Sequence, residues 1–397
     1  MILIDKPFVS EFLIKTIREN KFQIISTPES RNMISDKSLN WITEKEAISI
    51  IKKTTYYPIY INSENTISWI EKNFSSSNLP NQIQVFKNKI KFRELFKDFY
   101  PNYFFRGVKF EELRSLNIEE MKYPFIIKPA IGFFSIAVHK VDEPTEWNQV
   151  LDKIEYEIKK MQGLYPKEVI DITDFIIEDC IEGEEYAIDC YFDKEGEPIV
   201  LNILNHIFSS EKDVSDRIYS TSKEIMEKYN SEILDFLKTI GVKANLKNFP
   251  AHVEVRIDNE GKISPIEVNP LRFGGWRTTG DLSWYAYGVN SYEYFLNGKR
   301  PDWEEIFKTR KEKRYSIIVL DNNSGIKEND IEYFDYEQLL KDFEKPMSLR
   351  KVDFNEYSFF GFLFTETTCG NEKELNRILT SNLREYIKVK KTVADNG

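Results

Sequence analysis

The fold is decided by residues 251–270, which read AHVEVRID-NEGK-ISPIEVNP. Apolar and polar residues alternate on both sides of the Asn259–Gly261 turn, a pattern typical of two strands joined in a hairpin. Antiparallel pairing brings Glu254 close to Glu267. Asn269 lies two residues after Glu267 and therefore points to the same face of the sheet.

Two carboxylates and one amide thus converge on one face of this hairpin. Carboxylates held together repel each other, and their pKa values rise unless a cation lies between them. Oxygen ligands supplemented by water and phosphate suit Mg²⁺, with Mn²⁺ as an alternative. The opposite face is filled by Val253, Val255, Ile266 and Val268. We therefore favour Glu254, Glu267 and Asn269 as metal ligands over a solvated acidic face.

A lysine ends an apolar strand about 130 residues earlier. Residues 123–128 read YPFIIK, and Pro129 is expected to stop the strand there, which leaves Lys128 well placed for a phosphate. The turn over residues 131–138 can fold over a triphosphate with backbone donors and the Ser135 hydroxyl. Lys89, at the head of a predicted helix, brings a second cation. The alternatives are a solvated lysine at 128 and an ordinary surface lysine at 89.

A second pair of strands follows the lysine. Residues 175–178 form a predicted strand, residues 179–183 a connector, and strand alternation resumes at Glu184. The connector is able to present backbone groups to the edge of an adenine ring. Glu185 is able to accept hydrogen bonds from ribose hydroxyls, with a polar hairpin rim as the alternative.

In this order and at these separations, the three elements resemble the ATP-grasp superfamily, and in particular its carboxylate-amine ligase branch, which includes D-alanine–D-alanine ligase and biotin carboxylase. The resemblance covers about residues 85–300 and implies a nucleotide held between two α+β lobes. It places two lysines on phosphates, a glutamate and the connector at adenine, a glutamate at ribose, and the hairpin trio at magnesium. These positions are Lys89 and Lys128; Glu178, Asp179 and Ile181; Glu185; and Glu254, Glu267 and Asn269.

Two positions depart from the family pattern. Phe133 and Phe134 stand in the phosphate loop where the family usually has small residues. The family often has an arginine two positions after the asparagine ligand, whereas here Leu271 intervenes and the cation is Arg272. The resemblance implies a role for such an arginine in the transition state.

Two loops are candidates for the substrate pocket. The loop over residues 206–222 carries Arg217, which is either a grip for a carboxylate or the γ-phosphate, or a surface ion pair. The loop over residues 272–281 carries glycines that permit close backbone approach and arginines suited to bidentate carboxylate recognition. Its candidate residues are Arg272, Gly274, Gly275 and Arg277. We expect an acidic substrate. His206 is a candidate base, and His252 is expected to be a packing residue.

Composition restricts the class of protein. The 397 residues are 41% hydrophobic and carry a net charge of −10, which indicates folded cores and disfavours nucleic acid as a partner. The three cysteines fit neither a disulfide framework nor a metal site. The start of the chain does not read as a signal peptide, and no apolar run reaches about 18 residues. We expect no membrane association and a cytoplasmic location.

The chain is expected to combine α/β and α+β architecture in four parts. Residues 1–84 predict a Rossmann-like domain without a G-x-G-x-x-G motif. Residues 85–178 predict the first ATP-grasp lobe and its lid, and residues 179–302 the second lobe with the metal site. Residues 303–397 predict a small α+β lobe that ends in a helix over residues 372–386.

The function favoured by these motifs is an ATP-dependent ligase that joins a small carboxylate to an amine through an acyl phosphate. Lys128, Arg217 and Arg272 are its candidate catalytic residues. One alternative is a kinase of the same superfamily that phosphorylates a hydroxyl, and another is a catalytically silent nucleotide-binding regulator. The identity of both substrates, a thiol instead of an amine nucleophile, and assembly as a homodimer all stay open.

Overall fold

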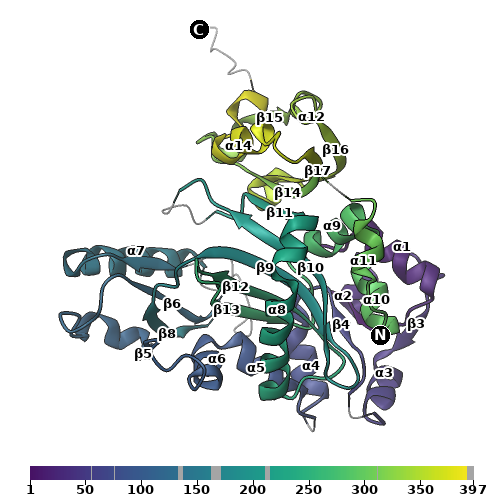
Figure 1. The fold of residues 1–397 in the computed structure, drawn as a ribbon, viewed down its shortest axis with the longest axis horizontal. Coiled ribbons are helices and arrows are strands. Elements are labelled where there is room, and N and C mark those ends of the chain that lie inside the picture. Colours follow the sequence, from purple (N-terminus) through teal and green to yellow (C-terminus); the bar gives the residue numbers. More distant parts are fainter. Residues whose placement is uncertain are drawn as a thin grey trace, which may run out of the picture.

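The computed structural model describes residues 1–54, 56–75, 77–132, 137–161, 171–210, 215–310 and 312–390. Within these ranges the strands form four sheets. Figure 1 shows one sheet with helix α7 (Trp147–Met161) at the left, the largest sheet in the centre and the N-terminal elements at the right. The expected α/β and α+β fold class is confirmed.

No helix in the described part of the chain is both long and apolar enough to span a membrane. The cysteines at 180, 190 and 369 form no disulfide bonds.

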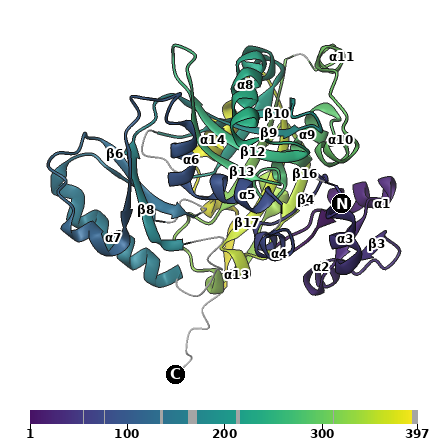
Figure 2. The ribbon, with the colours of Figure 1, turned by 90° about the horizontal axis from the view of Figure 1, so that it is seen from below.

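The N-terminal sheet is parallel and has the strand order β3-β2-β1-β4. Strands β1, β2 and β4 are almost entirely buried, as expected for strands of a parallel sheet covered on both faces, whereas the edge strand β3 is partly exposed. Its strands and the helices near it in sequence are β1 (Ile2–Leu3), α1 (Glu11–Asn20), β2 (Ile24–Ser26), α2 (Pro28–Met33), β3 (Trp41–Thr43), α3 (Glu44–Ile51), β4 (Tyr60–Ile61), the 3₁₀ turn η1 (Glu64–Thr66) and α4 (Ile67–Asn73). In Figure 2 these helices lie on the side opposite α7. The predicted βαβ beginning is present.

Two helices, α5 (Leu79–Lys87) and α6 (Lys89–Phe96), connect this region to the next sheet. The side chain of Asn88 caps α6 by accepting hydrogen bonds from Ile90 N (3.0 Å) and Lys91 N (3.1 Å). The cap fixes where α6 begins, so that Lys89 is its first residue.

The second sheet, called the lid sheet, is antiparallel with the order β5-β8-β6-β7. Its elements are β5 (Phe105–Lys109), η2 (Phe110–Ser115), β6 (Phe125–Ile131), β7 (His139–Val141), η3 (Pro144–Glu146), α7 and β8 (Asp171–Asp179). The sheet and α7 share an apolar core that includes Phe125, Leu151, Ile154 and Phe175. The expectation that Pro129 ends the strand is wrong, because β6 continues to Ile131 with a register shift after Pro129.

The third sheet, called the central sheet, has the order β13-β12-β9-β10-β11-β14-β17-β16. Its strands are β9 (Glu184–Phe192), β10 (Pro198–Ile207), β11 (Ile218–Ser222), β12 (Phe249–Ile257), β13 (Ile263–Pro270), β14 (Lys313–Asp321), β16 (Lys345–Lys351) and β17 (Phe359–Thr368). Helix α8 (Lys223–Ala244) packs against β10, and α9 (Thr278–Tyr287) contacts β10 and β14. The short helices α10 (Ser291–Asn297) and α11 (Trp303–Phe307) follow.

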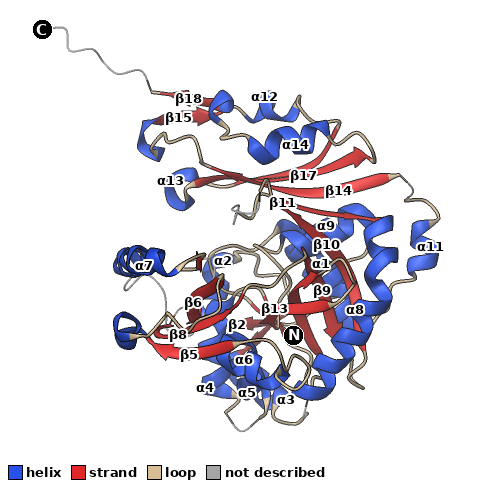
Figure 3. Ribbon diagram, turned by 60° about the vertical axis from the view of Figure 1, so that its left-hand side comes forward, coloured by secondary structure: helices blue, strands red, loops and turns tan. Residues whose placement is uncertain are grey.

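The C-terminal strands extend the central sheet, because β14 pairs with β11 across residues 218–222 (Figure 3). The expected boundary at residue 303 is therefore no break in this sheet, and the division into domains stays a prediction. Beyond the sheet lie η4 (Glu328–Asp330), β15 (Ile331–Phe334), α12 (Tyr336–Leu340), α13 (Phe354–Tyr357), α14 (Lys373–Thr380), η5 (Arg384–Tyr386) and β18 (Ile387–Val389). The final helix ends at Thr380, earlier than expected, because Ser381 is extended.

Candidate active site

The hairpin of β12 and β13 brings the predicted metal ligands together. Glu254 is directly opposite Glu267 in the antiparallel register. The Asn269 amide donates to Glu267 Oε1 at 3.1 Å and lies 3.5 Å from Glu254 Oε1. A register shift after Glu254 leaves Ile266 as an extra residue in β13, a β-bulge beside the acidic pair.

The trio fits a divalent cation by its chemistry. The Glu254 and Glu267 side chains are 24% and 23% exposed, so a ligand can reach them. Burial, and then the charge of Glu267, raise the pKa of Glu254. Burial acts in the same direction on Glu267, but Lys89, Lys87 and Lys128 outweigh it and hold its pKa well below the usual range. Among the described residues no group of three or more His, Cys, Asp or Glu side chains is placed to hold a metal ion. A divalent cation held here would take the Asn269 amide oxygen as its third protein donor.

Lys89 joins the acidic pair from the start of α6. Its Nζ lies 3.1 Å from Glu267 Oε2 and 3.4 Å from the carbonyl oxygen of Gly132 in the phosphate turn. The lysine is 9% exposed. It therefore neutralises the carboxylate that a metal ion would otherwise neutralise.

Lys128 belongs to a second buried ion cluster. Its Nζ lies 2.6 Å from Glu178 Oε1, while Arg93 Nε donates to Glu178 Oε2 at 2.7 Å. Burial would raise the pKa of Glu178, but Lys128 and Arg93 outweigh it and lower the pKa to about 2. Both carboxylate oxygens of Glu178 are thus engaged by cations, and its expected contact with adenine stays a prediction.

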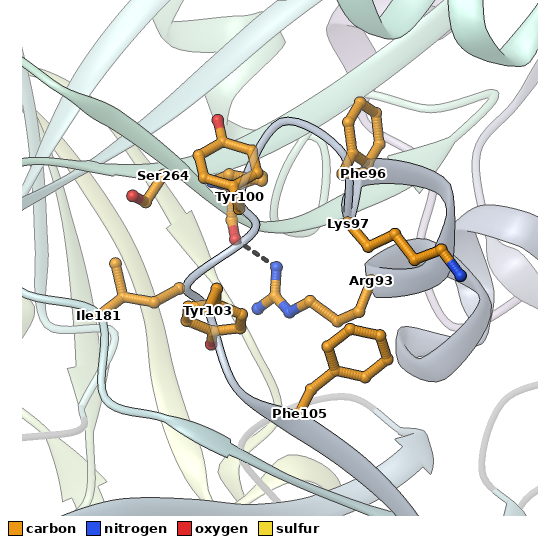
Figure 4. Close-up of a pocket in the computed structure, with 9 residues that line it drawn as sticks. Arg93, Phe96, Lys97, Tyr100, Tyr103, Phe105, Ile181 and Ser264 are labelled. Atoms are coloured by element: carbon orange, nitrogen blue, oxygen red, sulfur yellow. Dashed lines mark hydrogen bonds between the residues drawn. The ribbon is translucent and has the colours of Figure 1, made fainter.

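Arg93 is a functional candidate that the sequence analysis missed. Its guanidinium also donates to the carbonyl oxygens of Pro265 (2.6 Å) and Ile266 (3.4 Å), at the bulge of β13. In Figure 4 it lies in an aromatic pocket, with its carbon Cζ 4.9 Å from the ring centre of Tyr103. Arg93 thereby connects α6 to strand β8 of the lid sheet and to strand β13 of the hairpin. The sequence signal was its spacing of four residues from Lys89, which places both on one helix face.

Figure 4 shows the pocket that Arg93 lines together with the connector residue Ile181. It is lined by Arg93, Phe96, Lys97, Tyr100, Tyr103, Phe105, Ile181, Ser264 and Pro265. None of the predicted phosphate or metal residues lines it.

The phosphate turn is described only in part. Ser135, predicted to bind phosphate, lies outside the described residues, as do Phe133 and Phe134.

Glu185 carries a third ion cluster, on β9. It lies 2.9 Å from His206 Nδ1, and its other oxygen accepts from Arg256 Nε (3.2 Å) and NH2 (3.1 Å). Arg256 NH1 also donates to the carbonyl oxygen of Ile181 at 2.7 Å. Asp179, in contrast, is the last residue of β8, and its Oδ2 accepts a hydrogen bond from Phe104 N at 2.9 Å. The ribose and adenine roles of Glu185, Asp179 and Ile181 stay predictions.

His252 is a correction to the sequence analysis. It is buried, as a packing residue would be, but its Nδ1 lies 2.8 Å from Asp189 Oδ1 and its Nε2 lies 3.5 Å from Glu254 Oε1. Asp189 Oδ1 also accepts from the backbone N–H of Gly274 at 3.0 Å. Polar contacts from Gly274 through Asp189 and His252 to Glu254 thus connect the predicted substrate loop to strand β12.

The substrate loop contains two different arginines. Arg272 donates to Glu64 Oε1 at 2.9 and 2.7 Å, and Glu64 also pairs with Lys87. Burial would lower the pKa of Arg272, but Glu64, Glu267 and Glu254 raise it. Arg272 follows the end of β13 by two residues. Arg277 is buried and donates through NH1 to the carbonyl oxygen of Asn62.

The glycines of this loop differ in their surroundings. A Cβ on Gly274 would lie 2.2 Å from His252 Cε1, so the backbone approaches the imidazole closely. Gly275 is exposed and has a left-handed φ of 56°, a conformation that glycine adopts without steric cost.

Arg217 is not brought together with the other candidates. It is buried next to β11, and its NH1 donates to the carbonyl oxygen of Val319 in β14 at 3.2 Å. In the strand order, β12, β9 and β10 separate β11 from β13. The role of Arg217 as a grip for a carboxylate or the γ-phosphate stays a prediction.

Comparison with known proteins agrees with this geometry. Residues 121–280 match the profile of a family described as "ATP-grasp domain". No curated protein matches the chain at a significant level of sequence similarity.

Similar solved structures extend over nearly the whole chain. L-amino acid ligase from Bacillus licheniformis superposes with a TM-score of 0.69 and 17% identity, covering 98% of both chains. N5-carboxyaminoimidazole ribonucleotide synthetase from Thermotoga maritima gives 0.63 and 14%, again covering 98% of both chains. The biotin carboxylase domain of 2-oxoglutarate carboxylase from Hydrogenobacter thermophilus, solved with MgADP and bicarbonate, gives 0.59 and 13%, covering 98% of this chain and 90% of that one. At these identities the likeness is one of fold.

Residues 121–280 therefore match an ATP-grasp domain, as the motifs predicted. The fold of the chain is similar to those of the L-amino acid ligase and the N5-carboxyaminoimidazole ribonucleotide synthetase.

Proposed function

We propose that the protein is an ATP- and magnesium-dependent ligase that activates a small carboxylate and joins it to an amine, forming an amide between amino-acid-like metabolites. The observation that carries this proposal is the meeting of Glu254, Glu267 and Asn269 with Lys89, at 3.1 Å from Glu267. Two facing carboxylates beside a buried lysine fit a site where the carboxylates bind a divalent metal ion and the lysine binds a phosphate group.

The chain's own residues have separable roles in this proposal. Glu254, Glu267 and Asn269 would hold Mg²⁺ or Mn²⁺, which supplies positive charge next to the transferring phosphoryl group. Lys89 and Lys128 would bind phosphate oxygens, each exchanging its carboxylate partner for the nucleotide. Arg272, close to the trio and already balanced by Glu64, is the proposed stabiliser of charge as the phosphoryl group moves.

The reaction proceeds in two steps. A carboxylate oxygen of the first substrate attacks the γ-phosphorus of ATP, the bond to the β-phosphate oxygen breaks, and ADP leaves. The nitrogen lone pair of the amine then attacks the acyl carbon, phosphate departs with the C–O bonding electrons, and the nitrogen loses a proton. The protein contributes position and charge neutralisation in both steps, so little covalent chemistry falls to its side chains.

The similar structures support this reaction class. The three proteins compared above are named as a ligase, a synthetase and a carboxylase, and the last was solved with MgADP and bicarbonate. ATP and Mg²⁺ are therefore the proposed cofactors, and a small carboxylate and a small amine the proposed substrates.

The test is a screen of amino acids and small organic acids in pairs, with ATP and Mg²⁺, that measures ADP and inorganic phosphate separately. A ligase releases both in equal amounts and only when both substrates are present. Release of ADP without phosphate would indicate a kinase instead. The variant Glu267→Gln should abolish the signal, while Glu260→Gln, in the exposed turn of the same hairpin, should keep it.

A further inference from the structure

Arg277 is a buried cation with an unused hydrogen-bonding edge. Its side chain is 3% exposed, and its Nε and NH2 have no hydrogen-bond partner among the described residues. Burial lowers its pKa to about 10, and neighbouring Arg350 and Arg272 act in the same direction. A buried guanidinium that has lost water without gaining partners is destabilising, so the arrangement favours an added anion.

The two neighbouring arginines, Arg272 and Arg350, each already pair with a carboxylate. Arg272 pairs with Glu64 at 2.7 Å. Arg350 pairs with Asp281 Oδ2 at 2.5 Å and donates to the carbonyl oxygen of Trp276. Among the described residues Arg277 forms no ion pair: its NH1 donates to the uncharged carbonyl oxygen of Asn62, and its Cζ lies 5.6 Å from the centre of the Phe8 ring. The unbalanced positive charge of this region therefore lies on Arg277.

Other unpaired groups surround the same position. The Tyr60 hydroxyl and Thr279 Oγ1 are buried and have no partner in the described part of the chain. Arg277 itself is the N-cap residue of the ten-residue helix α9, and no side chain caps that helix. The first N–H groups of a helix carry partial positive charge and attract anions. The Tyr60 ring packs against that of Tyr292 with ring centres 5.2 Å apart, and the Tyr292 hydroxyl donates to the carbonyl oxygen of Arg277 at 3.4 Å, so Tyr60 belongs to the surroundings of Arg277.

We propose that Arg277, with the Tyr60 hydroxyl and the N-terminus of α9, forms a buried site for a carboxylate that the reaction does not activate. The Nε and NH2 groups together form the side edge of the guanidinium, whose two parallel N–H bonds match the two oxygens of one carboxylate. A hydroxyl donor and a helix N-terminus complete the environment of the same anion. The site lies in the loop that connects strand β13 of the hairpin to α9.

This inference rests on the proposed ligase function for the meaning of the site, and it narrows the substrate class. One substrate must carry a free carboxylate that remains in the product, as an amino acid does when its amine is acylated. Methyl esters or amides of that substrate lack the second anionic oxygen and should bind poorly, because the guanidinium would again be left without an anion.

The test measures binding without turnover, so that it is independent of the ligase reaction. The twenty amino acids and the matching amino-acid amides are added singly, without ATP, and the shift of the melting temperature is recorded. At least one amino acid should stabilise the protein, and its amide should be at least tenfold weaker. Arg277→Gln should abolish this preference. Tyr60→Phe, which removes only an unpaired hydroxyl, should weaken binding of the acid several-fold and leave the fold intact.

Arg300→Gln, which removes an exposed arginine elsewhere, is the matched control and should bind as the wild type does. Equal binding of acids and amides, or unchanged binding in Tyr60→Phe, would overturn the proposal. Stabilisation by inorganic phosphate but by no carboxylate would also overturn it and assign the position to a phosphoryl group. Carboxylate binding in a protein that shows no ligation in the substrate screen would sink the proposed function and leave this site standing.

Discussion

Lys89 Nζ lies 3.1 Å from Glu267 Oε2, so the first residue of helix α6 and a carboxylate of strand β13 neutralise each other across two parts of the fold. The two facing carboxylates, Glu254 and Glu267, require a nearby cation, and Lys89 supplies that positive charge. Metal binding and phosphate binding are therefore linked, because a metal ion on Glu267 frees Lys89 for a phosphate.

Removing Lys89 should make the protein depend on the metal for stability. In Lys89→Met, Glu254 and Glu267 face each other without a neighbouring cation, and we expect a loss of about 1–3 kcal/mol in the free energy of unfolding. Added Mg²⁺ should restore part of that loss without nucleotide. Urea unfolding with and without 10 mM Mg²⁺ measures both quantities. Lys91→Met, which removes an exposed lysine from the same helix, is the control, and an identical response in both variants would contradict the linkage.

The Glu267→Gln variant should separate catalysis from folding. A neutral amide keeps the shape of the side chain but weakens metal binding, so we expect phosphate release to fall by at least 100-fold. The melting temperature should change little, because Glu254 loses a repulsive neighbour while Lys89 loses its partner. Enzyme assay and thermal unfolding of the same sample check both. Full activity in this variant would remove the metal assignment.

Glu64 should contribute stability that depends on pH. Burial would raise its pKa, but Lys87 and Arg272 lower it from 4.5 to about 2. A depressed carboxyl pKa stabilises the fold above pH 4.5 and loses that contribution as the pH falls to 2, here about 3 kcal/mol. Urea unfolding between pH 7 and pH 2 should show this loss in the wild type.

In Glu64→Gln the part of the pH dependence between 4.5 and 2 should be smaller, although the variant is less stable at pH 7 because two buried cations lose their partner. Glu11→Gln, at an exposed position in the first turn of α1, should follow the wild-type profile. A wild-type profile in Glu64→Gln would show that another group causes the acid sensitivity.

The sequence predicted the parts of the site that depend on local pattern. The hairpin followed from alternation around the Asn259–Gly261 turn, and strand pairing then placed Glu254 opposite Glu267. The βαβ beginning was predicted for the same reason, because strand and helix periodicity are visible within short windows. The ATP-grasp domain was predicted from a resemblance in the order and separation of three motifs.

The missed residues depend on contacts between distant segments. Arg93 reaches Glu178 and Pro265, which lie 85 and 172 residues away. Glu64 pairs with Arg272 across 208 residues. No periodicity connects such positions, and a single sequence carries no record of which side chains meet. The strand through Pro129 was missed because tertiary pairing with β8 outweighed the local cost of proline.

The last prediction concerns the contact between Gly274 and His252. A methyl group at position 274 would lie 2.2 Å from His252 Cε1 and 2.4 Å from its Nδ1, and the ring cannot move without losing Asp189 at 2.8 Å. Gly274→Ala should therefore cost about 1–3 kcal/mol of stability and displace the substrate loop, lowering activity by at least tenfold. Replacing the imidazole side chain with a methyl group in His252→Ala removes the obstacle. The double variant should therefore be more stable, by about 1 kcal/mol or more, than the sum of the two single effects predicts. Urea unfolding of the four proteins in this cycle measures the coupling. Additive effects would mean that the glycine is not required by the imidazole.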